Sequence, residues 1–239
     1  MKILAIADTE ERCLWECFRK ERFEGVDLIL SAGDLDPDYL EFLVTVINKP
    51  LIYVRGNHDD RYARHAPGGC ICVEDTVYVY RGVRIAGLGG SMRYRDGANM
   101  YTEREMAKRV RKLSRKVRMV GGCDILLTHA PAAGEGDLDD LPHRGFKCFN
   151  TALESWNPDY MVHGMCTNAM VATFNVSVST HAGQRSSTPA AIRSLSWTKR
   201  ATPSVAGRQP GSIRKPCVAN SSATRLSSPQ PPEHPGNHL

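Results

Sequence analysis

The sequence lacks any long apolar run. Its 239 residues contain no stretch approaching the roughly 20 consecutive apolar residues that a membrane-spanning helix requires. No charged start followed by an apolar core indicates a signal peptide. These two absences predict a soluble, cytoplasmic protein with no membrane partner.

Cysteines arranged as metal-binding pairs are also lacking. The chain has eight cysteines but no pair of CxxC units, which excludes a structural zinc knot built on thiolates. Cys13 and Cys17 are four residues apart in a predicted helix, where burial as small hydrophobic side chains is the simplest interpretation. Without an export signal, the thiols are expected to be reduced.

Acidic residues are almost absent from the last third of the chain. Residues 165–239 carry eight Lys or Arg and one acid, Glu233, which gives this segment a net charge of +7. Residues 1–164 hold the other 23 basic and 25 acidic residues, a net charge of −2. The body of the chain therefore offers no electrostatic argument for a nucleic-acid partner.

The first 54 residues contain three short apolar runs separated by two amphipathic segments. The runs at 3–7, 28–32 and 51–54 are predicted strands. Helices are predicted over 11–23 and from Asp36-Pro37 to a stop at Pro50. Because the crossover between such strands is right-handed, the three strands are expected to be parallel within one sheet.

Beyond residue 70 the pattern first changes to a hairpin. Runs at 77–80 and 83–86 flank Arg81-Gly82, which is typical of a two-residue turn. Thr102 and Glu105 form a capping box that opens a helix reaching Val117, and its many Lys and Arg residues are interpreted as a solvated face. Strands at 123–127 and 160–162 follow, with a helix between them that carries Phe146 to Trp156.

Polar side chains follow four of the predicted strands. Asp8 follows the first, Asp34 the second, and Asn57 and His58 the third, while His129 follows the strand that ends near 127. Chemistry in open α/β sheets lies at the carboxyl edge of the strands. Each residue alone could be a helix cap or a turn residue, but the four strand ends together predict a shared metal-binding rim.

The chemistry of these donors indicates a particular class of ion. Carboxylate, carboxamide and imidazole groups suit divalent ions such as Mn, Fe, Zn or Ni. Two neighbouring ions can share a phosphoryl group and lower the pKa of a bridging water. His58 as an imidazolium could stabilise the transition state or protonate the leaving oxygen, and Asp59 could orient that imidazole.

Together these residues resemble the ordered signature of the calcineurin-like metallophosphoesterases. The resemblance covers roughly residues 1–164 and rests on Asp8, Gly33-Asp34, Gly56-Asn57-His58-Asp59 and His129. It implies an α/β fold in which a two-sheet β-sandwich is flanked by helices. It also implies two divalent metal ions and hydrolysis of a phosphodiester or phosphomonoester substrate through a metal-bridging hydroxide.

The resemblance also implies a role for each residue of the rim. Asp8 and Asp34 would bind the first ion. Asp34 would be shared with the second ion, whose other ligands would be Asn57 and His129. His58 would be the catalytic histidine.

Two departures from the family pattern concern metal ligands. The first motif usually ends in histidine, whereas this chain has Glu10, whose carboxylate can still bind a metal ion. The family closes its site with Gly-His-x-His, one histidine to each ion, whereas this chain has Gly164-Met165-Cys166-Thr167. The second departure predicts impaired activity and a disrupted C-terminal part of the fold.

The segment after Gly164 has an unusual composition. Its helix and strand periods disappear, which is typical of a disordered basic tail. The codons for Gly164 to Thr167, read one base earlier, permit His-Val-His and would restore the missing motif. We therefore predict a metallophosphoesterase domain over 1–164 that lacks its last strands, followed by a disordered tail over 165–239 translated in a shifted frame.

Other interpretations remain open at this point. Loss of metal ligands would also suit a non-catalytic interaction scaffold with the same fold, although retention of the other ligands argues against it. A nucleic-acid binder would depend entirely on the basic tail. His143 either reaches the pocket from the loop after His129 or is an ordinary surface histidine. The oligomeric state is not predicted.

Overall fold

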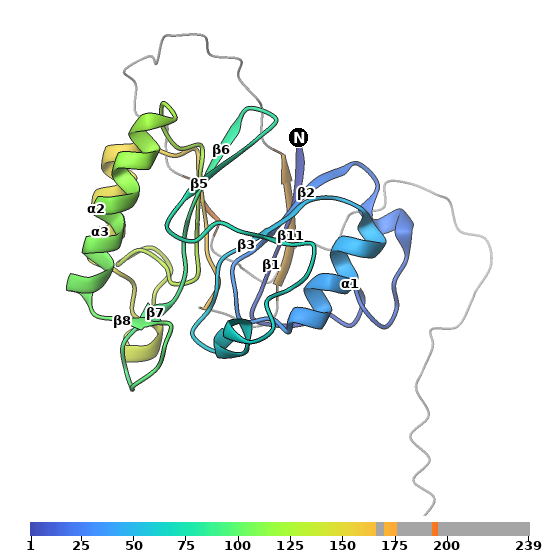
Figure 1. Cartoon of the computed structure of the whole chain (residues 1–239), viewed down its shortest axis with the longest axis horizontal. Helices are drawn as coiled ribbons and strands as arrows, with labels where there is room; N and C mark the ends of the chain where they lie inside the picture. The colour runs from blue at the N-terminus through green and yellow to red at the C-terminus, as the bar shows by residue number, and fades with distance from the viewer. Residues whose placement is uncertain (166–169, 176–192, 196–239) are drawn as a thin grey trace, which may run out of the picture. The chain divides into compact units, whose positions relative to one another are not determined.

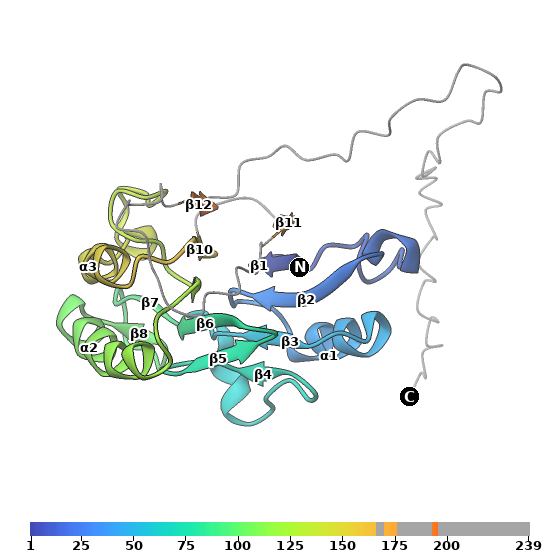
Figure 2. The same cartoon turned by 90° about the horizontal axis from the view of Figure 1, so that it is seen from above.

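Two five-stranded sheets form the centre of the structure (Figures 1 and 2). The computed structural model describes residues 1–165, 170–175 and 193–195. In spatial order, the first sheet contains β11 (Met170–Asn175), β1 (Lys2–Ala7), β2 (Val26–Ser31), β3 (Leu51–Tyr53) and β4 (Ile71–Cys72). The second sheet contains β12 (Arg193–Leu195), β10 (Tyr160–Val162), β9 (Ile125–Thr128), β6 (Val83–Leu88) and β5 (Val77–Tyr80). A separate short pair consists of β7 (Ser91–Met92) and β8 (Met100–Tyr101).

Helices cover the outer face of each sheet, so the fold has four layers. The α-helices are α1 (Pro37–Ile47), α2 (Glu103–Met119) and α3 (Lys147–Trp156). Figures 1 and 2 place α1 beside the first sheet and α2 and α3 beside the second. Three short 3-10 helices complete the structure: η1 (Lys20–Phe23), η2 (Asp59–Ala63) and η3 (Leu141–His143). None of these helices is long and apolar enough to cross a membrane.

Alternate residues of each strand belong to different apolar cores. Ile3 and Ala5 of β1 lie between the sheets, in one cluster with Ile125 of the second sheet. Leu4 points the other way, into the cluster that includes the inward face of α1. Leu126 likewise belongs to the cluster formed with α2 and α3. Burial on both faces explains why these parallel strands are continuous apolar runs in the sequence. The predicted two-sheet α/β fold flanked by helices is therefore confirmed.

The predicted helix over 11–23 is wrong. This segment contains turns, followed only by the short helix η1. The apolar face of the predicted helix consists of Cys13, Leu14, Cys17 and Phe18 and does not include Trp15. In the structure, however, the Trp15 ring lies 5.4 Å from that of Tyr39 and 5.2 Å from that of Phe42. A helix would place Trp15 on a different face from Leu14 and Phe18. Irregular turns allow all three side chains to pack against the cluster that contains α1.

The described residues beyond 164 include two strands. β11 pairs antiparallel with the whole of β1, from Lys2 opposite Asn175 to Ala7 opposite Met170. β12 pairs parallel with β10. Most of 165–239 lies outside the described residues, so its predicted disorder and shifted reading frame stay predictions.

The turn after β2 depends on Gly33. Its φ is +98°, and a Cβ atom built there would lie 2.4 Å from the backbone nitrogen of Gly56. We expect Gly33→Ala to lower the free energy of unfolding by about 3 kcal/mol, because backbone strain and a clash with backbone atoms act together. Denaturant unfolding measures this loss.

Gly134 provides the matched control for that substitution. Its φ is +84°, but nothing lies within 4 Å of a Cβ atom built there. Gly134→Ala should therefore cost only the backbone strain, about 1 kcal/mol. Equal losses for the two variants would contradict the role given to close packing between the turns at Gly33 and Gly56.

Candidate metal centre

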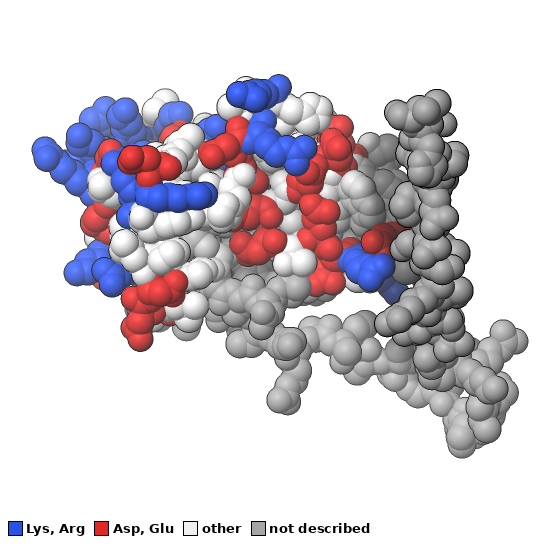
Figure 3. Space-filling view, turned by 90° about the horizontal axis from the view of Figure 1, so that it is seen from below, with Lys and Arg blue, Asp and Glu red and all other residues white. Residues whose placement is uncertain are grey.

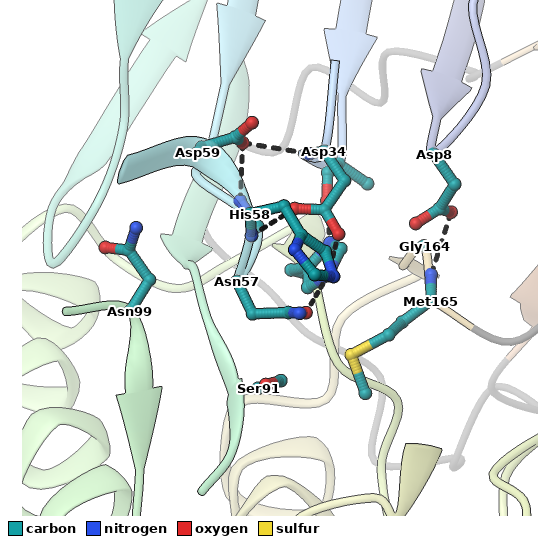
Figure 4. Close-up of polar contacts among 12 residues, drawn as sticks. Asp8, Asp34, Asn57, His58, Asp59, Ser91, Asn99, Gly164 and Met165 are labelled. Carbon is teal, nitrogen blue, oxygen red and sulfur yellow. Dashed lines mark hydrogen bonds and ion pairs between the residues drawn. The ribbon is translucent and has the colours of Figure 1, made fainter. Parts of the chain in front are cut away.

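The turns after β1 and β2 direct two carboxylates to the same edge of the first sheet. Asp8 and Asp34 both have left-handed backbone conformations, with φ of 59° and 57°. The backbone N–H of Asp8 donates to the carbonyl oxygen of Gly33 at 3.1 Å, which joins the two turns. Figure 4 shows both carboxylates below the ends of their strands.

A buried imidazole completes a three-residue group at this edge. One ligand atom each from Asp8, Asp34 and His129 lies within 4.8 Å of the others. His129 comes from the end of β9 in the second sheet and is 0% exposed, whereas the two aspartates are partly exposed. The site therefore lies where the carboxyl ends of both sheets meet.

Hydrogen bonds fix which nitrogen of His129 faces the carboxylates. Nδ1 lies 2.7 Å from the carbonyl oxygen of Ala32, to which it donates. Nε2 is thereby directed into the site, 2.9 Å from Oδ1 of Asn57 and 3.4 Å from Oδ2 of Asp34. Metal-bound histidines characteristically have the second nitrogen held in this way. The donor set and its outer hydrogen bonds therefore fit a divalent cation.

The three groups perturb one another electrostatically. Burial would lower the pKa of His129, but the charges of Asp34 and Asp8 raise it to about 9. Burial raises the pKa of Asp34, yet His129 and the N–H of His58 together bring it below its usual value. Burial raises the pKa of Asp8. The negative field that holds a proton on the imidazole would also favour a metal cation, whose binding displaces that proton.

Asp59 is hydrogen-bonded to the backbone of the turns after β2 and β3. Its Oδ2 accepts from the backbone N–H groups of Gly56 at 2.7 Å and Asp34 at 2.9 Å. Within the described part of the chain, no hydrogen bond joins Asp59 to the His58 ring. Burial raises the pKa of Asp59 to about 6, and the charge of Asp34 contributes to that rise. The residue is thus a buried acceptor that ties together two strand ends.

Removing this acceptor should loosen the whole site. We expect Asp59→Ala to lower the free energy of unfolding by about 3 kcal/mol, because two buried N–H groups lose their partner. Metal affinity should fall about 10-fold to 100-fold, as for other outer-shell losses. Denaturant unfolding and metal titration measure the two effects. Asp96→Ala, at an exposed acid of a nearby loop, is the control and should change neither quantity appreciably.

His58 lies beside the three-residue group, on its solvent-exposed side. Its side chain is exposed, and its backbone N–H donates to Oδ1 of Asp34 at 2.8 Å. This bond fixes the start of η2 against the carboxylate. The imidazole is therefore accessible to a molecule that approaches the metal group from solvent.

The structure does not bring Glu10 into the three-residue group. Its Oε1 accepts from the backbone N–H of Asp36 at 3.2 Å, so the side chain is directed toward the start of α1. His143 lies in η3, with Nδ1 2.5 Å from Oδ2 of Asp140. The His143 side chain is near enough to Asp8 for its charge to lower the pKa of that carboxyl.

Two further contacts were not expected from the sequence. Nδ2 of Asn57 donates to the phenolic oxygen of Tyr94 at 3.3 Å, and nothing in the sequence distinguishes this loop tyrosine. The backbone N–H of Met165 donates to Oδ2 of Asp8 at 2.8 Å. Position 165, where the family pattern has a histidine, is therefore adjacent to the carboxylate of Asp8. Cys166 and Thr167 lie outside the described residues.

Comparisons with known proteins identify the family of this chain. A model of the family described as calcineurin-like phosphoesterase matches residues 1–164. One solved structure shares the fold at 16% identity and a TM-score of 0.50, covering 68% of this chain and 83% of its own. The structure of TT1561 from Thermus thermophilus aligns at 19% identity and a TM-score of 0.48, covering 68% and 80%. No curated protein matches the sequence.

Proposed function

Because the chain belongs to the calcineurin-like phosphoesterase family, we propose that it hydrolyses a phosphodiester or phosphomonoester with the help of two divalent metal ions. The observation that best supports this proposal is the convergence of Asp8, Asp34 and His129 at one edge of the sheets. Asn57 adds a fourth donor beside His129.

The proposed ligand roles follow from the contacts of each side chain. Asp34 lies 3.4 Å from Nε2 of His129 and belongs to the same group as Asp8, so its carboxylate would be the bridge between the ions. Asp8 would complete the first ion's set, and Asn57 with Nε2 of His129 the second's. When bound, the ions would polarise the phosphoryl group and lower the pKa of a water. Glu10 is the weakest member of this proposal, since its carboxylate accepts from the N–H of Asp36 instead.

His58 is the proposed catalytic residue. It is exposed beside Asp34, so its imidazolium could contact a phosphoryl oxygen or give a proton to the leaving oxygen. Asp59 would act as a positioning residue, through its bonds to the N–H groups of Gly56 and Asp34.

Activity of this particular chain is proposed to be impaired, because residues 165 and 167 are Met and Thr rather than histidine. The rival is a non-catalytic scaffold with the same fold. Metal analysis separates the two proposals. A metalloenzyme would retain Mn after purification and desalting, whereas a scaffold would bind none.

The direct test is hydrolysis of bis-p-nitrophenyl phosphate by the purified chain with Mn. We expect slow turnover that EDTA abolishes. His58→Ala should lower kcat by about 100-fold or more while metal content is retained, since general acid catalysis contributes at least that much. His65→Ala, at an exposed histidine beside Asp38, is the control and should leave kcat unchanged. Absence of both metal binding and turnover would exclude the enzyme.

A further inference from the structure

The helix α2 carries two parallel stripes of opposite character. Its buried side chains are Met106, Val110, Leu113 and Val117. Its exposed side chains include Arg104, Lys108, Arg111, Arg115 and Arg118. Both sets recur at alternating intervals of four and three residues, so each is nearly straight along the helix. The two sets differ by two positions, about 200° around the axis, so the cations face directly away from the core.

The five cations of this exposed set, called the basic stripe below, are not neutralised within the described part of the chain. No side-chain hydrogen bond or ion pair there involves any of them. The helix has only two acids, and both are engaged. Glu103 accepts from the backbone N–H of Cys148 at 2.7 Å, and Glu105 accepts from that of Thr102 at 2.8 Å. Lys112, also exposed, adds a further positive charge beside the stripe.

Basic side chains are concentrated on one side of the molecule. Figure 3 views the protein from below relative to Figure 1. The largest gathering of blue side chains lies at the upper left, the side that α2 occupies, with some red side chains beside it, and red side chains predominate at the centre. The net charge of −2 for residues 1–164 therefore conceals a locally basic surface.

Contacts link the start of the basic stripe to the metal centre. The Tyr94 hydroxyl accepts from Nδ2 of Asn57, and the neighbouring residue, Arg93, forms an ion pair with Glu105 at 3.0 Å. Glu105 lies next to Arg104, the first residue of the stripe. A polymer bound along α2 would therefore have one end near the proposed phosphoesterase site.

The stripe favours an extended polyanion over other partners. It is about 21 Å long, from the rise of 14 residues. The large apolar side chains exposed on this helix and just after it are Met119 and Val120, at its far end, whereas a membrane-binding helix needs an apolar face along its length. A straight row of cations can follow the backbone of a flexible single strand, whereas a helix that reads a duplex lies in the major groove and presents side chains to base edges as well as to phosphates. Single-stranded binding commonly uses such a charged track.

We propose that α2 binds single-stranded nucleic acid along the basic stripe, and that the substrate of the proposed site is a phosphodiester of that polymer. The cleavage part rests on the proposed function, whereas the binding part rests on α2 alone.

Binding is best measured by fluorescence anisotropy with a labelled oligothymidylate of about 15 nucleotides, a typical site size, in EDTA. The full chain is compared with a triple variant carrying Lys108→Gln, Arg111→Gln and Arg115→Gln. We expect the affinity to fall about tenfold or more at about 50 mM salt. The slope of log affinity against log salt should fall by about 2, because each lost phosphate contact removes about 0.7.

The matched control removes three charges elsewhere. Arg19→Gln, Lys20→Gln and Lys49→Gln give the same change in net charge, and the last two line a small pocket near the start of β2. The control should change affinity less than about twofold, because its three residues lie outside the stripe and would lose no phosphate contact. Residues 165–239 are present in every variant, so their contribution cancels. Equal loss in both triple variants would overturn the proposal.

Other outcomes are also decisive. Preferential binding to anionic phosphatidylglycerol vesicles, or to polyglutamate, over the oligonucleotide would overturn the choice of partner. Because binding is measured in EDTA, it does not depend on hydrolysis. A chain that binds the oligonucleotide but fails to hydrolyse bis-p-nitrophenyl phosphate would count against the proposed function only. A chain that hydrolyses this ester but binds no oligonucleotide would overturn the inference drawn from α2.

Discussion

Replacing Asp34 with asparagine should abolish metal binding and activity together. Its Oδ1 accepts from the N–H of His58 and its Oδ2 lies 3.4 Å from Nε2 of His129, so one carboxylate contacts both sides of the site. Loss of an outer-shell partner typically costs 10-fold to 100-fold, so loss of this ligand should exceed about 100-fold in metal affinity and kcat/KM. Metal analysis after desalting and hydrolysis of bis-p-nitrophenyl phosphate measure the two effects.

Asp96→Asn is the control for this substitution. Asp96 is an exposed acid that belongs to neither group of side chains able to hold a metal ion in the described part of the chain. It should retain the metal content and the rate of the unaltered chain. Retention of metal by Asp34→Asn, with thermal stability unchanged, would contradict its role as the bridging ligand.

Restoring two histidines should produce the second large effect. In the double variant Met165→His and Thr167→His, the first histidine replaces a residue whose N–H already contacts Asp8. Metal content should rise toward two ions per chain, and kcat/KM should rise by more than about 100-fold, since each ligand matters at least as much as an outer-shell partner. Inductively coupled plasma mass spectrometry and the same ester assay measure these changes.

A double variant with glutamine at both positions controls for altered packing. Glutamine resembles histidine in size but is a poor ligand, so this variant should remain as weak as the original chain. Equal activation by both variants would show that the histidines do not act as ligands. Nucleotide sequencing across the Gly164 codon tests the origin of the change separately. A shifted frame without His-x-His would contradict the proposed frameshift.

Strand periodicity was sufficient to predict that Asp8, Asp34, Asn57 and His129 come together at one edge of the sheets. Parallel strands with continuous apolar runs must end at a common edge, so the polar residues after them converge whatever the details of the turns. The contacts of individual side chains were harder to predict. Glu10 was expected to bind a metal ion and Asp59 to orient the His58 ring. In the structure, Glu10 accepts from the N–H of Asp36, and Asp59 accepts from the N–H groups of Gly56 and Asp34.

Contacts between residues that are distant in the sequence could not be predicted from the sequence pattern. Trp15, which is not on the apolar face of the predicted helix, packs against Tyr39 and Phe42 of α1. Tyr94 reaches Asn57 from a loop that the sequence pattern leaves undistinguished. The basic stripe of α2 was visible as a group of cations, but its lack of neutralising partners depends on how Glu103 and Glu105 are used.

The antiparallel pairing of β11 with β1 has a consequence for shortened versions of the protein. A fragment ending at Gly164 would expose the backbone edge of β1 along its entire length. That edge belongs to a segment whose Ile3, Leu4 and Ile6 side chains are almost fully buried. Unprotected apolar edges of this kind recruit strands from other molecules. Such a fragment would thus tend to self-associate, even though it contains every residue proposed to contact a metal ion.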